Sequence, residues 1–225
     1  MKVDADTFLF PENLRRYVRT QGWSPDERHY FGHRLMHTDR PGQAPIVAGA
    51  AVGLSRAAVE GLAAVFRGFA PNIGNRMMNH CGDAHLANGE EVVMAVCLRQ
   101  HLNVSAHHAL DADLKELVSI FPIGLGLTFP RDDGHWYWQR RTAGAACCSD
   151  TPVALHDFKD PRLLYEIQRE VYDPMNPARV GTRSEDLLHL YGPDPDRTLD
   201  YLARVRAAMN AKEAPRAREE RREGG

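Results

Sequence analysis

The segment 79–85 (NHCGDAH) brings together side chains that ligate metal ions. His80, Cys81 and His85 offer two imidazoles and a thiol, and Asp83 adds a carboxylate. These ligand types suit zinc or iron. Their spacing matches no established metal motif, and an asparagine, a glycine and an aspartate at the same place are also typical of a polar turn. A metal site and a polar turn are therefore both open for this segment.

The chain has four cysteines, at positions 81, 97, 147 and 148. They form no CxxC pair, so the sequence predicts neither a zinc finger nor the disulfide framework of a small secreted protein. Two of them are adjacent, which is unusual. Because thiolates are good ligands for zinc and iron, we expect this pair to take part in a metal site. The predicted metal ligands are His80, Cys81, His85, Cys147 and Cys148.

Histidines are frequent elsewhere in the chain as well, with eleven in total. His29, His33 and His37 recur at every fourth position, so on a helix their imidazoles would share one face. Neighbouring pairs could chelate a metal, or the three could form the solvent-facing side of an amphipathic helix. The adjacent pair 107–108 is a less specific candidate, because the nearby Asp111 also suits a helix cap.

The sequence contains no local signature of nucleophilic catalysis or nucleotide binding. GxSxG, HExxH, the P-loop and GxGxxG are all absent. The aromatic run 135–138 (HWYW), followed by Arg140 and Arg141, could stack on bases or bind an anion. A buried corner of the core is the other interpretation of this run. An enzyme with an unrecognised active site therefore stays an alternative.

Composition narrows the classes of partner. The chain has 225 residues, of which 43% are apolar and 26% are charged, enough to bury one substantial core. The formal net charge of −2 implies no general attraction to nucleic acid or to anionic lipid. No apolar stretch approaches the roughly 20 residues that a membrane span needs, and the N-terminal residues lack a cationic region. We expect a cytoplasmic protein without a membrane partner.

Caps, prolines and apolar spacing predict mostly helices. The segment 24–37 opens with a capping box, Ser24-Pro25-Asp26-Glu27, and the run 46–52 fits a helix or a buried strand, with helix preferred. Near 123–139, alternating apolar residues and a Pro-Gly turn indicate a β-hairpin. The predicted helices cover about 11–21, 24–37, 55–69, 92–102, 111–121, 160–171, 184–191 and 198–209.

The predicted fold class is accordingly all-α, with at most one small β-hairpin. A single helical domain is expected over residues 1–210, followed by a disordered charged tail at 211–225. Within the domain, we expect an N-terminal helical pair (1–40), a central region (41–158) and C-terminal helices (159–210). The predicted core consists of Val59, Leu62, Phe66, Val93, Val96, Leu114, Leu117, Val118, Phe121, Leu164 and Ile167.

Short motifs between residues 53 and 147 resemble NifQ, the molybdenum-carrier family of nitrogen fixation. The pieces that carry the resemblance are Gly53-Leu-Ser55 before a helix, Cys97-Leu98 with His101-Leu102, Leu114-Lys-Glu-Leu117 closing on Phe121-Pro122, and Trp138 nine residues before Cys147. The resemblance implies metal handling, and a helix instead of a hairpin at 136–147. The family's four-cysteine motif, understood to hold an iron–sulfur cluster, is absent, because no cysteine follows Cys148.

The leading functional hypothesis is thus a non-enzymatic metal-handling accessory protein of the NifQ type. The resemblance implies delivery of molybdenum or iron for cofactor assembly, and the ligand types allow zinc as well. Such a protein needs a protein partner to receive its cargo. The alternative is a metal-free helical module for protein–protein interaction or regulation, whose histidines are polar surface residues.

Overall fold

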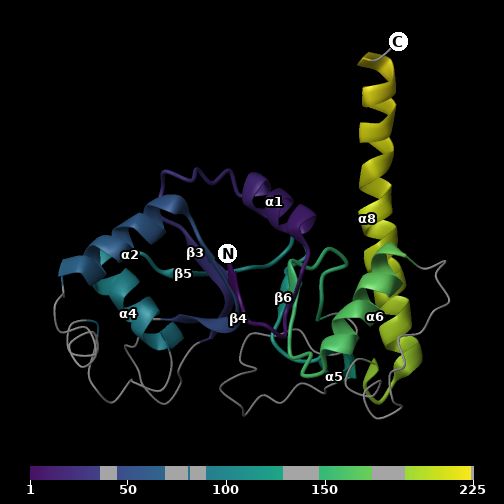
Figure 1. Ribbon diagram of the computed structural model, residues 1–225, viewed down its shortest axis with the longest axis horizontal. Helices are drawn as coiled ribbons and strands as arrows, with labels where there is room; N and C mark the ends of the chain where they lie inside the picture. Colours follow the sequence, from purple (N-terminus) through teal and green to yellow (C-terminus); the bar gives the residue numbers. More distant parts are fainter. Residues whose placement is uncertain (36–44, 69–80, 82–89, 129–146, 174–190, 224–225) are drawn as a thin grey trace.

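The chain folds into two small β-sheets with helices packed around them (Figure 1). The computed structural model describes residues 1–35, 45–68, 81, 90–128, 147–173 and 191–223, with the backbone alone described after residue 211. Within these ranges, no helix is both long and apolar enough to cross a membrane.

The larger sheet has four strands in the order β1-β4-β3-β5. Strand β4 is antiparallel to both of its neighbours, whereas β3 and β5 run parallel to each other. The strands are β1 (Lys2–Val3), β3 (Tyr30–Leu35), β4 (Ile46–Leu54) and β5 (Ala106–His108). Parallel neighbours need a long crossover, and here the chain between β3 and β5 includes β4 and two helices.

Those two helices, α2 (Arg56–Gly68) and α4 (Glu90–Leu102), pack together on one side of the sheet (Figure 1). Helix α1 (Pro11–Thr20) packs against the same core through Leu14, Tyr17 and Val18. The core around the sheet joins all of these elements through buried residues such as Val47, Val52, Leu62 and Leu98.

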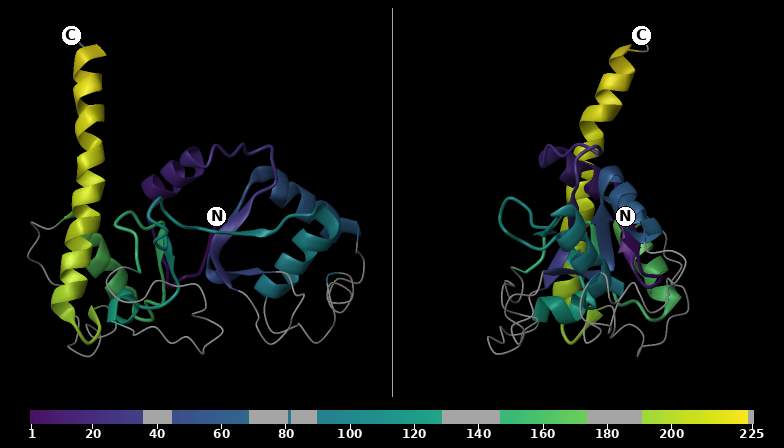
Figure 2. Two further views of the ribbon diagram at one scale, coloured as in Figure 1. Left: turned by 180° about the vertical axis from the view of Figure 1, so that it is seen from behind. Right: turned by 90° about the vertical axis from the view of Figure 1, so that its left-hand side faces the viewer.

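A second sheet and a second core form the rest of the described chain. The sheet has the order β2-β7-β6, with β2 (Phe8–Leu9), β6 (Val118–Ser119) and β7 (Ala154–Leu155). Its neighbours are α5 (Ile123–Thr128), α6 (Pro161–Tyr172) and α8 (Pro195–Glu223). Helices α5 and α6 both contact α8. Both views in Figure 2 show the C-terminal turns of α8 extending past the rest of the described chain.

The all-α prediction is wrong, since the structure has two mixed sheets of four and three strands. The run 46–52 lies within β4, whose apolar side chains are buried on both faces of the sheet. A strand of this kind has no period of two, so its sequence looks like that of a buried helix. Non-local pairing with β1 and β3 decides the conformation.

The helix predicted at 24–37 is also absent from its described part. The Ser24 hydroxyl and carbonyl accept the N–H groups of Asp26 and Glu27, so the capping signals build one turn. From Tyr30 the chain is extended, as strand β3. The predicted helical stripe of three histidines is therefore not formed, because His33 lies on strand β3 and His29 lies just before it. Position 37 lies outside the described residues.

The segment 111–121 forms a turn and strand β6 where a helix was predicted. Leu114, a member of the predicted core, is consequently 69% exposed in that turn. Val59, another member, is 49% exposed on the outer side of α2. Residues 123–128 form helix α5, not the first strand of a hairpin, and residues 129–139 lie outside the described part. At the C-terminus, α8 continues to Glu223 over most of the predicted tail.

Candidate metal centre

Two imidazoles and a carboxylate converge between the sheet and the loop that follows β5. His33, His108 and Glu116 each offer one ligand atom, and these atoms all lie within 4.8 Å of one another. His33 Nδ1 is 3.3 Å from Glu116 Oε2, and the two imidazole rings are 5.1 Å apart, edge to face. The side chains of His33 and Glu116 are each only 3% exposed, while His108 is partly accessible.

His33 is placed by an irregularity in the pairing of β3 with β4. The register shifts between Gly32 and Arg34, and β4 contains the extra residues, so His33 lies opposite a β-bulge. Bulges redirect side chains and are common beside functional sites. A glycine precedes the bulge for a physical reason: its φ is +156°, and a Cβ there would collide with Val47 and with the Ala51 carbonyl.

The parallel pairing of β3 with β5 places His108 beside His33. Gly32 is the partner of His108 in this pairing. The Gly32 carbonyl accepts the N–H of Ala109 at 2.8 Å, which continues the pairing one residue beyond β5. The backbone thus holds the two histidines on adjacent strands, although they are far apart in the sequence.

The loop 109–117 returns Glu116 to the same place. Its turn is organised by Asp111, whose Oδ1 accepts the N–H groups of Asp113 and Lys115, both at 2.9 Å. Leu117 N–H then donates to Ala109 O at 3.0 Å, which closes the loop. The aspartate expected to cap a helix therefore stabilises a turn, a role for which its short side chain is equally suited.

Glu116 also pairs with the segment that holds the adjacent cysteines. Its N–H donates to Cys147 O, and its carbonyl accepts the N–H of Ser149, both at 3.0 Å. Cys147 and Cys148 form a disulfide with each other and are buried. The carbonyl of Ser149 in turn accepts the buried hydroxyl of Tyr201 on α8. Backbone hydrogen bonds therefore link the carboxylate to the second core.

The predicted ligands do not meet as one set in the described chain. Cys81 forms a disulfide with Cys97 on α4 and belongs to the first core, whereas Cys147 and Cys148 belong to the second. His80 and His85 lie outside the described residues. A disulfide sulfur is not a thiolate and is not the ligand that zinc or iron prefers. A site at these residues stays a prediction for the reduced protein.

The spacing of His33 and Glu116 suits a shared ion. Two ligand atoms that each lie about 2.0–2.1 Å from a tetrahedral ion are about 3.4 Å apart, close to the observed 3.3 Å. The widest separation in the group is at most 4.8 Å, so the third ligand would move by about an ångström to bind the same ion. A bound cation would also lower the free-energy cost of burying the Glu116 carboxylate.

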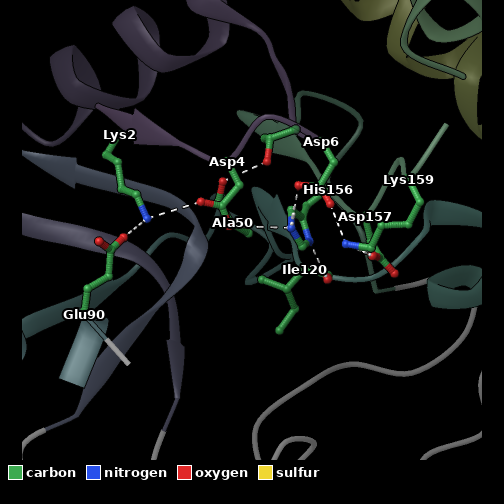
Figure 3. A network of polar contacts seen from close by, with 10 residues as sticks. Lys2, Asp4, Asp6, Ala50, Glu90, Ile120, His156, Asp157 and Lys159 are labelled. Carbon is green, nitrogen blue, oxygen red and sulfur yellow. Dashed lines mark hydrogen bonds and ion pairs between the residues drawn. The ribbon is translucent and has the colours of Figure 1, made fainter. Parts of the chain in front are cut away.

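A second group of this kind joins the N-terminal segment to the chain after β7 (Figure 3). His156 Nδ1 donates to Ile120 O at 2.9 Å, and His156 Nε2 lies 3.2 Å from Asp6 and 3.8 Å from Asp4. Lys159 binds Asp6 and also contacts Asp157 at 2.7 Å.

A lysine therefore already supplies the positive charge in this second group. Burial raises the pKa of the Asp6 carboxyl, but the Lys159 hydrogen bond and the nearby positive charges outweigh burial and hold it below the usual value. In return, the hydrogen bonds that Lys159 donates to Asp157 and Asp6 raise the pKa of Lys159. Because this lysine already compensates the charge of Asp6, a metal ion would gain less here, and the more buried group is the better candidate.

Sequence reasoning passed over the residues that the fold brings together. His33 was considered only on a helix, His108 only as a less specific neighbour of Asp111, and Glu116 only within a predicted helix. One signal was present: Phe31, His33 and Leu35 are spaced two residues apart, and residues with this spacing lie on one face of a β-strand. A histidine between two apolar residues on such a face is expected to be buried.

Comparison with known proteins adds no further evidence on this site. None of the protein families compared with this chain matches it. The resemblance to NifQ consequently stays a prediction, and the case for a site depends on the geometry of His33, His108 and Glu116.

Proposed function

We propose that the chain is a metal-binding protein that holds one divalent transition-metal ion between His33, His108 and Glu116. The observation that carries the proposal is the convergence of three ligand atoms within 4.8 Å at a place where two of the side chains are almost completely buried. The proposal agrees with the metal-handling role expected from the sequence, but its ligands are not the residues predicted there.

The ligand set favours zinc or iron(II). Two histidines and one carboxylate bind zinc in catalytic sites, and the same set binds non-haem iron(II) with positions left open. No thiolate belongs to this set, so it does not depend on reduction of the two disulfides. His108 is the most accessible of the three residues, so we expect the ion to enter on its side.

The number of metal ions bound per chain tests the proposal, and it is compared between variants of two adjacent histidines. His108→Gln removes a proposed ligand, whereas His107→Gln changes the adjacent, exposed residue of the same strand. Chelator-treated protein is dialysed against zinc or, without oxygen, against iron(II), and bound metal is measured by elemental analysis. We expect about one ion per chain for the unchanged protein and His107→Gln, and almost none for His108→Gln.

Glu116→Gln provides a second test, because it preserves the shape of the side chain and removes its charge. It should also abolish binding, and the ion should no longer raise the unfolding temperature. At an ion concentration 100 times the Kd, this stabilisation is about 2.7 kcal/mol in the unchanged protein. Failure of the unchanged protein to bind either metal, or binding that survives both substitutions, would refute the site. A metal-free interaction module would then be the better hypothesis.

A further inference from the structure

A cavity of about 410 Å³ separates helix α1 from the loop 110–117. Its volume lies within the roughly 300–1,000 Å³ range of small-molecule sites. Tyr17, Leu110 and Leu117 contribute apolar surface, and two charged residues of opposite sign, Arg16 and Asp111, also line it. The cavity is distinct from the candidate metal centre, whose ligands are not among its lining residues.

Arg16 is held in place by an uncharged side chain. Its Nη2 donates to Asn13 Oδ1 at 2.7 Å, and in the described part of the chain Arg16 forms no ion pair. Asn13 is only 2% exposed, and its Nδ2 donates to Pro152 O at 2.8 Å, which orients Oδ1 toward the arginine. Burial also lowers the pKa of the guanidinium. A partly desolvated arginine in a fixed orientation is well suited to bind a carboxylate.

Asp111 offers the complementary charge. Its Oδ1 accepts the two N–H groups that build the turn, while its Oδ2 has no hydrogen bond or ion pair in the part of the chain that the structure describes. Asp111 and Arg16 form no ion pair with each other, although both line the cavity. Each charge is therefore available to a ligand that lies between them.

We infer that this cavity binds a small zwitterion of the amino-acid class, with its carboxylate on Arg16 and its ammonium group on Asp111. A ligand of this kind pairs with both charges at once. A simple anion bound to Arg16 would instead face the negative charge of Asp111 without a group to pair with it. The apolar residues of the cavity would contact the ligand's side chain. This binding site is independent of the proposed metal site and would survive its failure.

Titration calorimetry with each of the twenty amino acids tests the inference. The best binder is then compared with two analogues, one lacking the amino group and one lacking the carboxylate. Arg16→Gln should weaken binding of the amino acid and of the des-amino acid, by about 30-fold or more. Asp111→Asn keeps an oxygen for the two N–H groups, and should weaken binding of the amino acid alone.

Two further variants keep the result interpretable. Arg15→Gln changes an exposed arginine that does not line the cavity, and should bind like the unchanged protein. Arg16→Lys keeps the charge without the planar fork, and should bind more weakly than the unchanged protein but better than Arg16→Gln. The inference is overturned if no amino acid binds, or if the des-amino acid binds as well as the amino acid and Asp111→Asn has no effect.

Discussion

The two groups of histidine and carboxylate side chains differ in burial and in the side chains that contact them. His33 and Glu116 lie almost completely out of water, whereas the side chains of Asp4 and Asp6 are 39% and 22% exposed. Lys159 provides a cation for the exposed group, whereas in the buried group the Glu116 carboxylate lies 3.3 Å from the His33 imidazole. The same residue types therefore form a surface network in one place and a candidate ion site in the other.

The comparison shows that ligand proximity alone does not identify a metal site. In both groups the three ligand atoms lie within 4.8 Å of one another. What differs is burial, since the Glu116 side chain is 3% exposed and that of Asp6 is 22% exposed. Water stabilises an exposed carboxylate, whereas a carboxylate removed from water depends more on nearby polar groups or a cation.

The largest expected difference between the groups is in metal binding itself. The double substitution of Asp6→Asn and His156→Gln should leave one zinc ion bound per chain, because the buried group is unchanged. His33→Gln should reduce bound zinc to almost none. Elemental analysis after dialysis measures both. The reverse result would move the ion to the network in Figure 3 and would reverse the comparison.

In the metal-free protein, the groups should differ strongly in stability. Glu116→Ala removes one partner of a buried carboxylate–imidazole pair and leaves a cavity, and should lower the free energy of unfolding by about 3–5 kcal/mol. Asp6→Ala should lower it by less than about 1 kcal/mol, since its partners are partly exposed. Urea unfolding followed by circular dichroism measures both values. Equal losses would mean that burial does not distinguish the groups.

The backbone at the bulge should matter nearly as much. Gly32→Ala introduces a Cβ that collides with Val47 and with the Ala51 carbonyl, and should cost about 3 kcal/mol and weaken metal binding at the adjacent His33. Gly22→Ala is the control. Gly22 also has positive φ, +68°, but its Cβ would meet open space, so the cost should be about 1 kcal/mol with metal binding unchanged.

The smallest expected effect is the pH dependence of the exposed group. The folded-state pKa of Asp6 is lowered, so its ion pair with Lys159 stabilises the fold above the ordinary carboxyl pKa of about 4 and is lost as pH falls through the lower folded value. Asp6→Asn should therefore be less stable than the unchanged protein by up to about 1 kcal/mol at pH 6, with the difference vanishing toward about pH 2. Lys159→Met should give the same profile. Urea midpoints between these pH values test both.

Local signals in the sequence predicted several helices correctly. Ser55 caps α2 through the N–H of Ala58, and Asp160 caps α6 through the N–H of Arg162, as their positions before the helices indicated. The helices expected at 11–21 and 92–102 are confirmed within a few residues by α1 and α4. Each of these signals acts between residues that are neighbours in the chain.

The strands and the candidate centre could not be predicted in the same way. His33 and His108 become neighbours only because β5 pairs with β3, and that pairing leaves no local signal in either segment. Buried on both faces, β4 lacks the alternation that identifies a strand. Glu116 depends on an aspartate turn that resembles a helix start. Interactions between distant segments therefore decided the parts of the structure that the sequence analysis missed.

The pairing of Glu116 with residues 147–149 has a consequence for folding. The carboxylate reaches its final position only after that later segment has been synthesised and has docked, and long-range pairing of this kind is slow. An ion at the centre would thus bind the nearly completed fold and not an early intermediate. Interactions that form after the transition state act mainly on the unfolding rate, so the bound ion would lengthen the lifetime of the folded chain more than it would accelerate folding.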